Sequence, residues 1–88
     1  MPAVNEHIAV QVLLFSMLRE KLGRTSLEVS LEPGATGKDL LDQLCEQYTE
    51  ICAYQQVVRL AVNASYVKDD VVLEAGDEVA LITPVSGG

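Results

Sequence analysis

Hydrophobic residues alternate with other residues along four stretches of the chain, and this pattern predicts β-strands. The stretches are 8–15, 26–32, 58–63 and 78–83. Successive side chains of a strand point to opposite faces of a sheet, so a period of two gives each strand one apolar face for a core. Tyr66 and Val67 follow the turn residues Asn63-Ala64-Ser65 and predict a further short strand.

A different spacing, of three and four residues, predicts the main helix from Thr36 to about Tyr48. The apolar residues at this spacing are Leu40, Leu41, Leu44, Cys45 and Tyr48. Thr36 is followed three residues later by Asp39, which resembles a capping box with Asp in the usual Glu position. A shorter helix is expected over 16–22 and should stop at Gly23. Residues 49–56 have weak periodicity and are either a loop or one further helical turn.

The predicted elements follow one another as strand, strand, main helix, strand, short strand, strand. This order is typical of the β-grasp (ubiquitin-like) class of α+β folds, in which a mixed sheet of about five strands packs one face on one main helix. An unrelated α+β roll would have the same element order and stays an alternative. We expect one domain over 1–83 and a flexible C-terminal tail over 84–88.

The other face of this sheet is also apolar in places. By the same alternation, Leu13, Phe15 and Ile82 fall on the side away from the core. Burying side chains of this size against a partner would contribute about 1.5–3 kcal/mol each. These positions therefore predict a docking surface, unless they pack under a loop of the same chain.

Length and charge restrict the classes of function. With 88 residues the chain has little room for an interior active-site cleft, so chemistry is expected at an edge. Thirteen acidic against six basic residues give a net charge of −7, which argues against nucleic acid and anionic membrane surfaces as partners. No apolar run approaches the roughly 20 residues of a membrane span.

The N-terminal residues 1–7 lack a secretory signal, so a cytoplasmic location is expected. Cys45 and Cys52 lie seven residues apart and match neither a CxxC motif nor a disulfide framework, so in a reducing compartment they are expected to remain thiols. With His7 as the one histidine, the chain has too few ligands for a zinc site, and no metal is expected.

The sequence ends in Gly87 and Gly88. Glycines offer no side chain to bury, so the simplest interpretation is a frayed terminus. The functional interpretation is that two residues without a Cβ let an extended backbone enter a channel too narrow for side chains. The terminal carboxylate would then reach the catalytic groups of another protein.

Several segments together resemble the small subunits of molybdopterin synthase, which are ubiquitin-like sulfur carriers. The similar segments are 12–20 (VLLFSMLRE), 32–36 (EPGAT), 61–63 (AVN) and 76–88 (GDEVALITPVSGG). The chain departs from the family pattern in three places. Gly37 replaces an aliphatic residue, Ala64-Ser65 replaces a common Gly-Glu pair, and Thr83 replaces a common proline.

The resemblance implies a chemical role for Gly88. A ubiquitin-activating-type adenylyltransferase would use ATP and magnesium to adenylate its carboxylate, and a sulfur donor sulfurtransferase would convert it to a thiocarboxylate. The thiocarboxylate would then give its sulfur to cyclic pyranopterin monophosphate, forming the dithiolene of molybdopterin. The chain would bind no cofactor itself, and the catalytic residues would belong to the large synthase subunit.

The resemblance also implies which residues meet the large subunit in a heterotetramer. Phe15, Tyr66 and Ile82 would form the hydrophobic contact, and Pro84, Val85 and Ser86 would lead the two glycines into the partner. Three alternatives stay open. The first is a thiamin-type sulfur carrier, which usually lacks the 18–20 and 84–86 segments. The second is a protein modifier, which would join Gly88 to a lysine and usually has arginine in place of Ser86. The third is a β-grasp interaction module, in which the tail would have no function.

Overall fold

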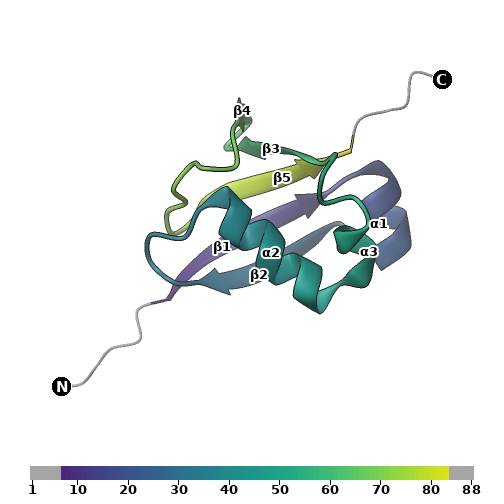
Figure 1. Ribbon diagram of the computed structural model, residues 1–88, viewed down its shortest axis with the longest axis horizontal. Helices are drawn as coiled ribbons and strands as arrows, with labels where there is room; N and C mark the ends of the chain where they lie inside the picture. The colour runs from purple at the N-terminus through teal and green to yellow at the C-terminus, as the bar shows by residue number, and fades with distance from the viewer. Residues whose placement is uncertain (1–6, 84–88) are drawn as a thin grey trace.

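A computed structural model describes residues 7–83 as a mixed β-sheet with its helices packed on one face (Figure 1). The elements in chain order are β1 (Ile8–Leu14), α1 (Ser16–Leu22), β2 (Ser26–Leu31), α2 (Gly37–Gln47), α3 (Thr49–Cys52), β3 (Arg59–Val62), β4 (Ser65–Val67) and β5 (Glu78–Ile82). The predicted order is confirmed. The stretch 49–56, for which two interpretations were open, begins with the short helix α3.

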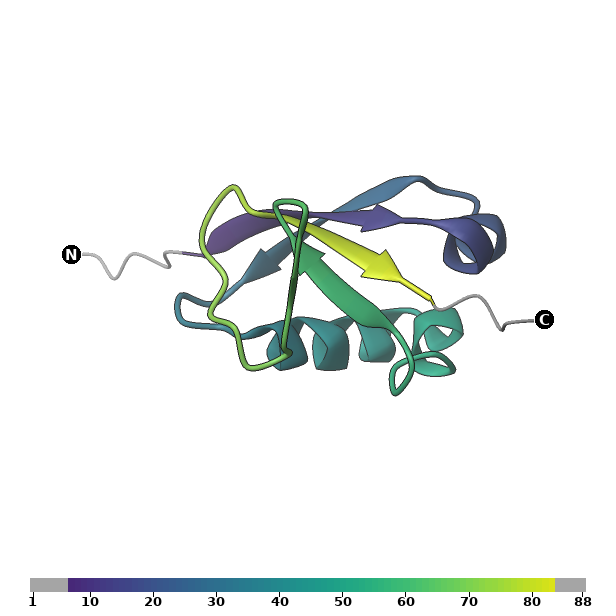
Figure 2. The same ribbon diagram turned by 90° about the horizontal axis from the view of Figure 1, so that it is seen from above.

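The strands lie side by side in the order β2-β1-β5-β3-β4. β1 pairs antiparallel with β2 and parallel with β5, and β3 pairs antiparallel with both β4 and β5. The helix α2 runs along one face of this sheet, as Figure 2 shows. A helix packed across a mixed sheet in this order is the predicted β-grasp arrangement. The strands β1 and β5 are parallel, so their C-terminal ends lie at the same end of the sheet.

The core lies between the sheet and α2, and its residues follow the predicted alternation. Val10, Val12 and Leu14 of β1 are buried, as are Val79 and Leu81 of β5. The same layer holds the buried α2 residues Leu40, Leu41 and Leu44, together with Leu27, Val29, Leu31, Leu60 and Leu73. Burial of aliphatic side chains at about 1.5–3 kcal/mol each is the main source of stability for a sheet of this size.

The first turn of α2 has the predicted capping box. The Thr36 hydroxyl accepts a hydrogen bond from the Asp39 backbone N–H at 3.2 Å, and the Asp39 carboxylate accepts one from the Thr36 backbone N–H at 2.9 Å. The backbone hydrogen bond, followed by that from the Thr36 hydroxyl, lowers the pKa of Asp39, because both favour the ionised carboxylate. This reciprocal pair satisfies N–H groups that the helix cannot satisfy itself.

Residues 69–71, which precede β5 in the chain, also fix the start of α2 through backbone hydrogen bonds. The Gly37 and Lys38 backbone N–H groups donate to the carbonyls of Val71 and Asp69, at 2.9 and 2.7 Å. A Cβ on Gly37 would lie 2.5 Å from Cδ1 of Leu60 and 3.2 Å from the Asp69 carbonyl oxygen. Leu60 therefore occupies the space that a side chain at position 37 would need.

We expect Gly37→Val to lower the free energy of unfolding by about 1–3 kcal/mol, because the new side chain overpacks this site. Leu60→Ala alone should lower it by about 2–5 kcal/mol through the cavity it leaves. The double variant should lose less than the sum of the two, since each change relieves the other. Urea unfolding of the four proteins measures this coupling, and strictly additive losses would contradict it.

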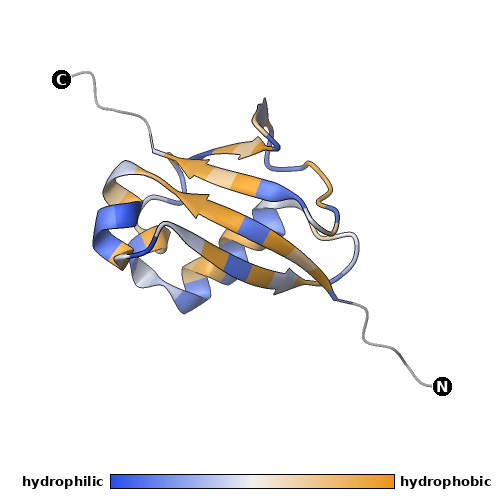
Figure 3. Ribbon diagram, turned by 180° about the vertical axis from the view of Figure 1, so that it is seen from behind, coloured by the Kyte–Doolittle hydropathy of each residue, from blue (hydrophilic) through white to orange (hydrophobic). Residues whose placement is uncertain are grey.

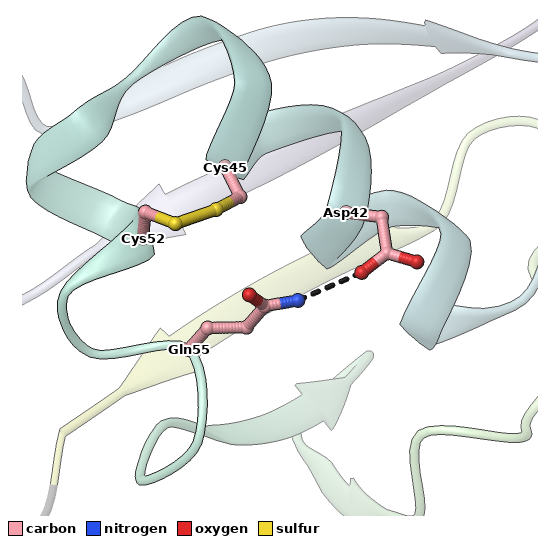
Figure 4. Close-up of a disulfide and its surroundings, with 4 residues drawn as sticks. All are labelled: Asp42, Cys45, Cys52 and Gln55. Atoms are coloured by element: carbon pink, nitrogen blue, oxygen red, sulfur yellow. Dashed lines mark hydrogen bonds between the residues drawn. A yellow bond between two sulfur atoms is a disulfide. The ribbon is translucent and has the colours of Figure 1, made fainter.

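The expectation that Cys45 and Cys52 remain thiols is wrong for this structure. The two cysteines form a disulfide, with their Cα atoms 4.3 Å apart (Figure 4). Tyr48 ends α2 and starts α3, so the chain reverses there and brings the two sulfurs together. The Gln55 side chain ties the same region to α2 by donating to Asp42 at 2.7 Å. Sequence spacing gave no sign of this reversal.

Within residues 7–83, no helix is long and apolar enough to cross a membrane. The predicted roles of Pro84, Val85, Ser86, Gly87 and Gly88 fall outside the described residues.

Candidate functional site: an apolar patch on the open sheet face

The sheet face opposite α2 has no helix over it, and Figure 3 views the molecule from this side. A shallow depression of about 280 Å³ lies here, lined by Leu13, Phe15, Ala61, Ala64, Tyr66, Glu78, Ala80 and Ile82. We call its apolar members, which are all of these except Glu78, the open-face patch. Leu13, Phe15 and Ile82, predicted to face away from the core, are therefore brought together with Tyr66.

Strand register explains why this patch is hollow. Leu13 of β1 pairs with Ala80 of β5, Ala80 pairs with Ala61 of β3, and Ala61 pairs with Tyr66 of β4. Across the four strands β1, β5, β3 and β4, this row thus has two alanines between the large residues Leu13 and Tyr66. Paired side chains on one face lie about 5 Å apart, so the alanines leave room for a partner's side chain. Sequence reasoning missed Ala61 and Ala80, because a small residue at an alternating position looks unremarkable until its neighbours are known.

Phe15 continues the alternation of β1 past the end of that strand. Its backbone is extended, with φ −130° and ψ 158°, and Ser16 then turns the chain into α1 with a φ of +49°. Phe15 is 41% exposed and Tyr66 is 67% exposed, so within the described residues no loop covers them. Among residues 7–83, Phe15 and Tyr66 are therefore exposed rather than packed under a loop.

The patch extends along β5 to the end of that strand. Ile82 is the last residue of β5, and the parallel pairing of β1 with β5 places the end of β1, next to Phe15, at the same end of the sheet. Residues 84–88 follow β5 in the chain after Thr83. A protein that covers the open-face patch would therefore also meet the chain where it leaves the sheet.

Apolar side chains make up the open-face patch. No charged or polar side chain is buried among residues 7–83. The same part of the chain contains no group of three or more His, Cys, Asp or Glu side chains that could hold a metal ion. The arrangement is suited to contact with another protein's apolar side chains.

Comparison with known proteins gives the family. The model of the ThiS family matches residues 12–88. The molybdopterin synthase sulfur carrier subunit of Mycobacterium tuberculosis is 39% identical, with 92% of this chain and 99% of the relative covered. That of Arabidopsis thaliana is 33% identical, with 92% of this chain and 84% of the relative covered.

Solved structures show the same fold. Putative molybdopterin converting factor subunit 1 from Pyrococcus furiosus has a TM-score of 0.77 at 27% identity, covering 89% of this chain and 99% of that one. Small archaeal modifier protein 1 from Haloferax volcanii has a TM-score of 0.77 at 28% identity, covering 91% and 99%. A complex of subunits 1 and 2 of the Helicobacter pylori molybdopterin-converting factor shares the fold alone, with a TM-score of 0.66 at 20% identity, covering 92% and 100%.

The family model covers most of the chain, and both relatives exceed 30% identity over most of their length. The chain belongs to the ThiS family, and its curated relatives are molybdopterin synthase sulfur carrier subunits.

Proposed function

We propose that this chain is the sulfur carrier subunit of a molybdopterin synthase. The observation that supports this most is the family match, which extends through Gly88 and joins the chain to relatives with that name. The open-face patch supports it independently, because a carrier must bind the protein that uses its sulfur. The patch is apolar and extends to the C-terminal end of β5, from which the chain continues toward Gly88.

The proposed chemistry takes place at the carboxylate of Gly88. A free carboxylate is a poor electrophile, so an adenylyltransferase first joins it to AMP from ATP, releasing pyrophosphate, with magnesium on the nucleotide. The outer sulfur of a sulfurtransferase persulfide then attacks the carbonyl carbon. The C–O bond to AMP breaks, AMP leaves with the oxygen, and Gly88 is joined to the sulfurtransferase through an acyl disulfide. A thiol reductant cleaves the S–S bond, which releases Gly88 as a thiocarboxylate.

The thiocarboxylate is the nucleophile of the second half of the cycle. It attacks cyclic pyranopterin monophosphate within the large synthase subunit and forms a C–S bond to the pterin. Water then hydrolyses the resulting thioester to Gly88, which returns the Gly88 carboxylate and leaves the sulfur on the pterin. Two such transfers supply the two sulfurs of the dithiolene. The large subunit contributes the catalytic residues, and Gly87 and Gly88 present no Cβ to its active site. In this proposal the large subunit binds the open-face patch through Phe15, Tyr66 and Ile82. The Helicobacter pylori structure is a complex of subunits 1 and 2 of a molybdopterin-converting factor, which supports a partner of this kind.

Intact-mass measurement tests the carrier function. After incubation with the adenylyltransferase, ATP, magnesium and a sulfur donor, the protein should gain about 16 Da, from exchange of one oxygen for sulfur at Gly88. Omitting ATP is the matched control and should leave the mass unchanged. No gain in the presence of enzymes that load a known carrier would contradict the proposal.

A protein modifier is the second candidate, because small archaeal modifier protein 1 has the same fold at 28% identity. The same incubation separates the two functions when it is carried out in cell extract. A modifier would appear joined to lysines of other proteins through an isopeptide bond that reducing agents do not cleave. A carrier would be recovered as the free thiocarboxylate and would support molybdopterin formation with the large subunit.

A further inference from the structure

Arg59 lies beside the open-face patch and has no role in the sulfur chemistry. It pairs in register with Ile82, the last residue of β5, and its guanidinium carbon lies 5.7 Å from the centroid of the Tyr66 ring. Arg59 and Ala61 are two residues apart in β3, so both side chains belong to the open face. Arg59 thus lies next to one aromatic member of the patch, Tyr66, and one aliphatic member, Ile82.

The contact with Tyr66 positions this cation without neutralising it. Among residues 7–83 the only ion pair joins Lys38 to Asp42, so Arg59 has no carboxylate partner within the described part of the chain. Its side chain also donates none of the hydrogen bonds found between described residues. A guanidinium has five N–H donors and stays protonated at any physiological pH.

A partner that covers Ile82 and Tyr66 removes water from Arg59 as well. A charged group without a partner is costly to bury, and Arg cannot avoid that cost by releasing a proton. The docked protein must therefore supply acceptors, and a carboxylate matches the planar fork of the guanidinium with two parallel hydrogen bonds. The neighbouring carboxylates of this chain do not fill that role in the described residues.

We propose that Arg59 is a specificity residue of the open-face patch and pairs with a carboxylate of the large synthase subunit. The proposal rests on the proposed function, which supplies the partner, and adds the chemistry that this partner must present. The large subunit must place an apolar side chain in the hollow over Ala61 and Ala80. Next to that side chain it must present an Asp or Glu to the Arg59 guanidinium.

The charges around the patch also give docking a direction. Glu78 lines the depression at the start of β5, whereas Arg59 stands opposite Ile82 at the end of that strand. Ile82 lies four positions after Glu78, which is about 13 Å along a strand. A partner carboxylate placed over Arg59 is attracted, but the same group placed over Glu78 in a reversed orientation is repelled. The charge of Arg59 therefore favours one of the two orientations over the other.

Binding of the large subunit to four versions of the full chain tests the proposal. Arg59→Glu should weaken binding about 30-fold or more, because it leaves the partner carboxylate facing a like charge. Arg59→Met keeps the apolar stem over Tyr66 and should weaken binding about tenfold. Lys38→Glu makes the same change of charge on α2, outside the open-face patch, and should alter binding by about twofold or less. Added salt should weaken the wild type more than Arg59→Met.

The outcomes are separable from those of the proposed function. If the wild type gains sulfur and binds the large subunit, but Arg59→Glu and Arg59→Met bind as the wild type does, the role of Arg59 is overturned. It is also overturned if the variants bind normally and lose only loading by the adenylyltransferase, since the cation then serves that contact. A wild-type chain that neither gains sulfur nor binds overturns the proposed function itself. Thermal unfolding of Arg59→Met ensures that a binding loss is measured on a folded protein.

Discussion

Phe15→Asp is expected to weaken binding to the large synthase subunit about 100-fold, which corresponds to about 3 kcal/mol. Phe15 is an exposed aromatic member of the open-face patch, and its burial against a partner contributes about 1.5–3 kcal/mol. The aspartate would lose that contribution and bring a carboxylate into an apolar contact, where its desolvation adds to the loss. Titration calorimetry with the purified large subunit measures the change in Kd.

The fold should survive this substitution for a specific reason. Phe15 is the N-cap residue of α1, and no side chain caps that helix at present. Aspartate is among the preferred N-cap residues because its carboxylate accepts hydrogen bonds from the first N–H groups of a helix. The melting temperature should therefore change little, and a large fall would show that Phe15 supports the core instead.

A second exposed side chain provides the matched control. Val72 is 58% exposed, lies outside the open-face patch, and forms a bridge with Thr36 at the start of α2. Val72→Asp makes the same kind of change at a site that the large subunit is not expected to cover. Its Kd should stay within about twofold of the wild type. Equal losses for Phe15→Asp and Val72→Asp would mean that net charge, rather than the patch, governs binding.

Deletion of Gly88 is expected to abolish sulfur transfer altogether. One extended residue spans about 3.5 Å, so the deletion withdraws the reacting carboxylate by that distance from the partner's catalytic groups. Misplacement of a reacting group by about 1 Å can already cost about 100-fold in rate. The mass gain of about 16 Da should therefore be absent in the deletion variant, although Gly87 still ends in a carboxylate.

Two further measurements make this result specific. Thermal unfolding of the Gly88 deletion should match the wild type, because the core lies within residues 8–81. Gly88→Ala keeps the carboxylate in its place and adds one Cβ, so it should be loaded more slowly rather than not at all. Normal loading of the deletion variant would show that the carboxylate need not stand at the position of Gly88.

Much of the architecture could be predicted because its causes are local. The even positions of β1 are buried as the alternation indicates, and α1 ends at Gly23, which has the left-handed φ of +68° that glycine adopts readily. The capping box at Thr36 and Asp39 is likewise a contact between residues three apart. Such features depend on strand period, helix period and nearby hydrogen bonds, all of which are visible in the order of residues.

The candidate site was only partly predictable. Alternation placed Leu13, Phe15 and Ile82 on the open face, and the resemblance to a family added Tyr66. The hollow between them depends on Ala80 and Ala61 being paired across β5 and β3. These two alanines are 19 positions apart in the chain, so their meeting is a property of strand register, which no single stretch of sequence contains.

The sequence therefore accounts for the elements, the core face of each strand and the two glycines on which the proposed chemistry depends. Tertiary structure was needed for the order of strands, for the disulfide between Cys45 and Cys52, and for the contact of Leu60 with the site of Gly37. It was also needed to place Arg59 against Tyr66 and Ile82. The physical reason is the same in each case: local patterns specify what each segment buries, whereas side chains distant in sequence meet only after those segments have packed together.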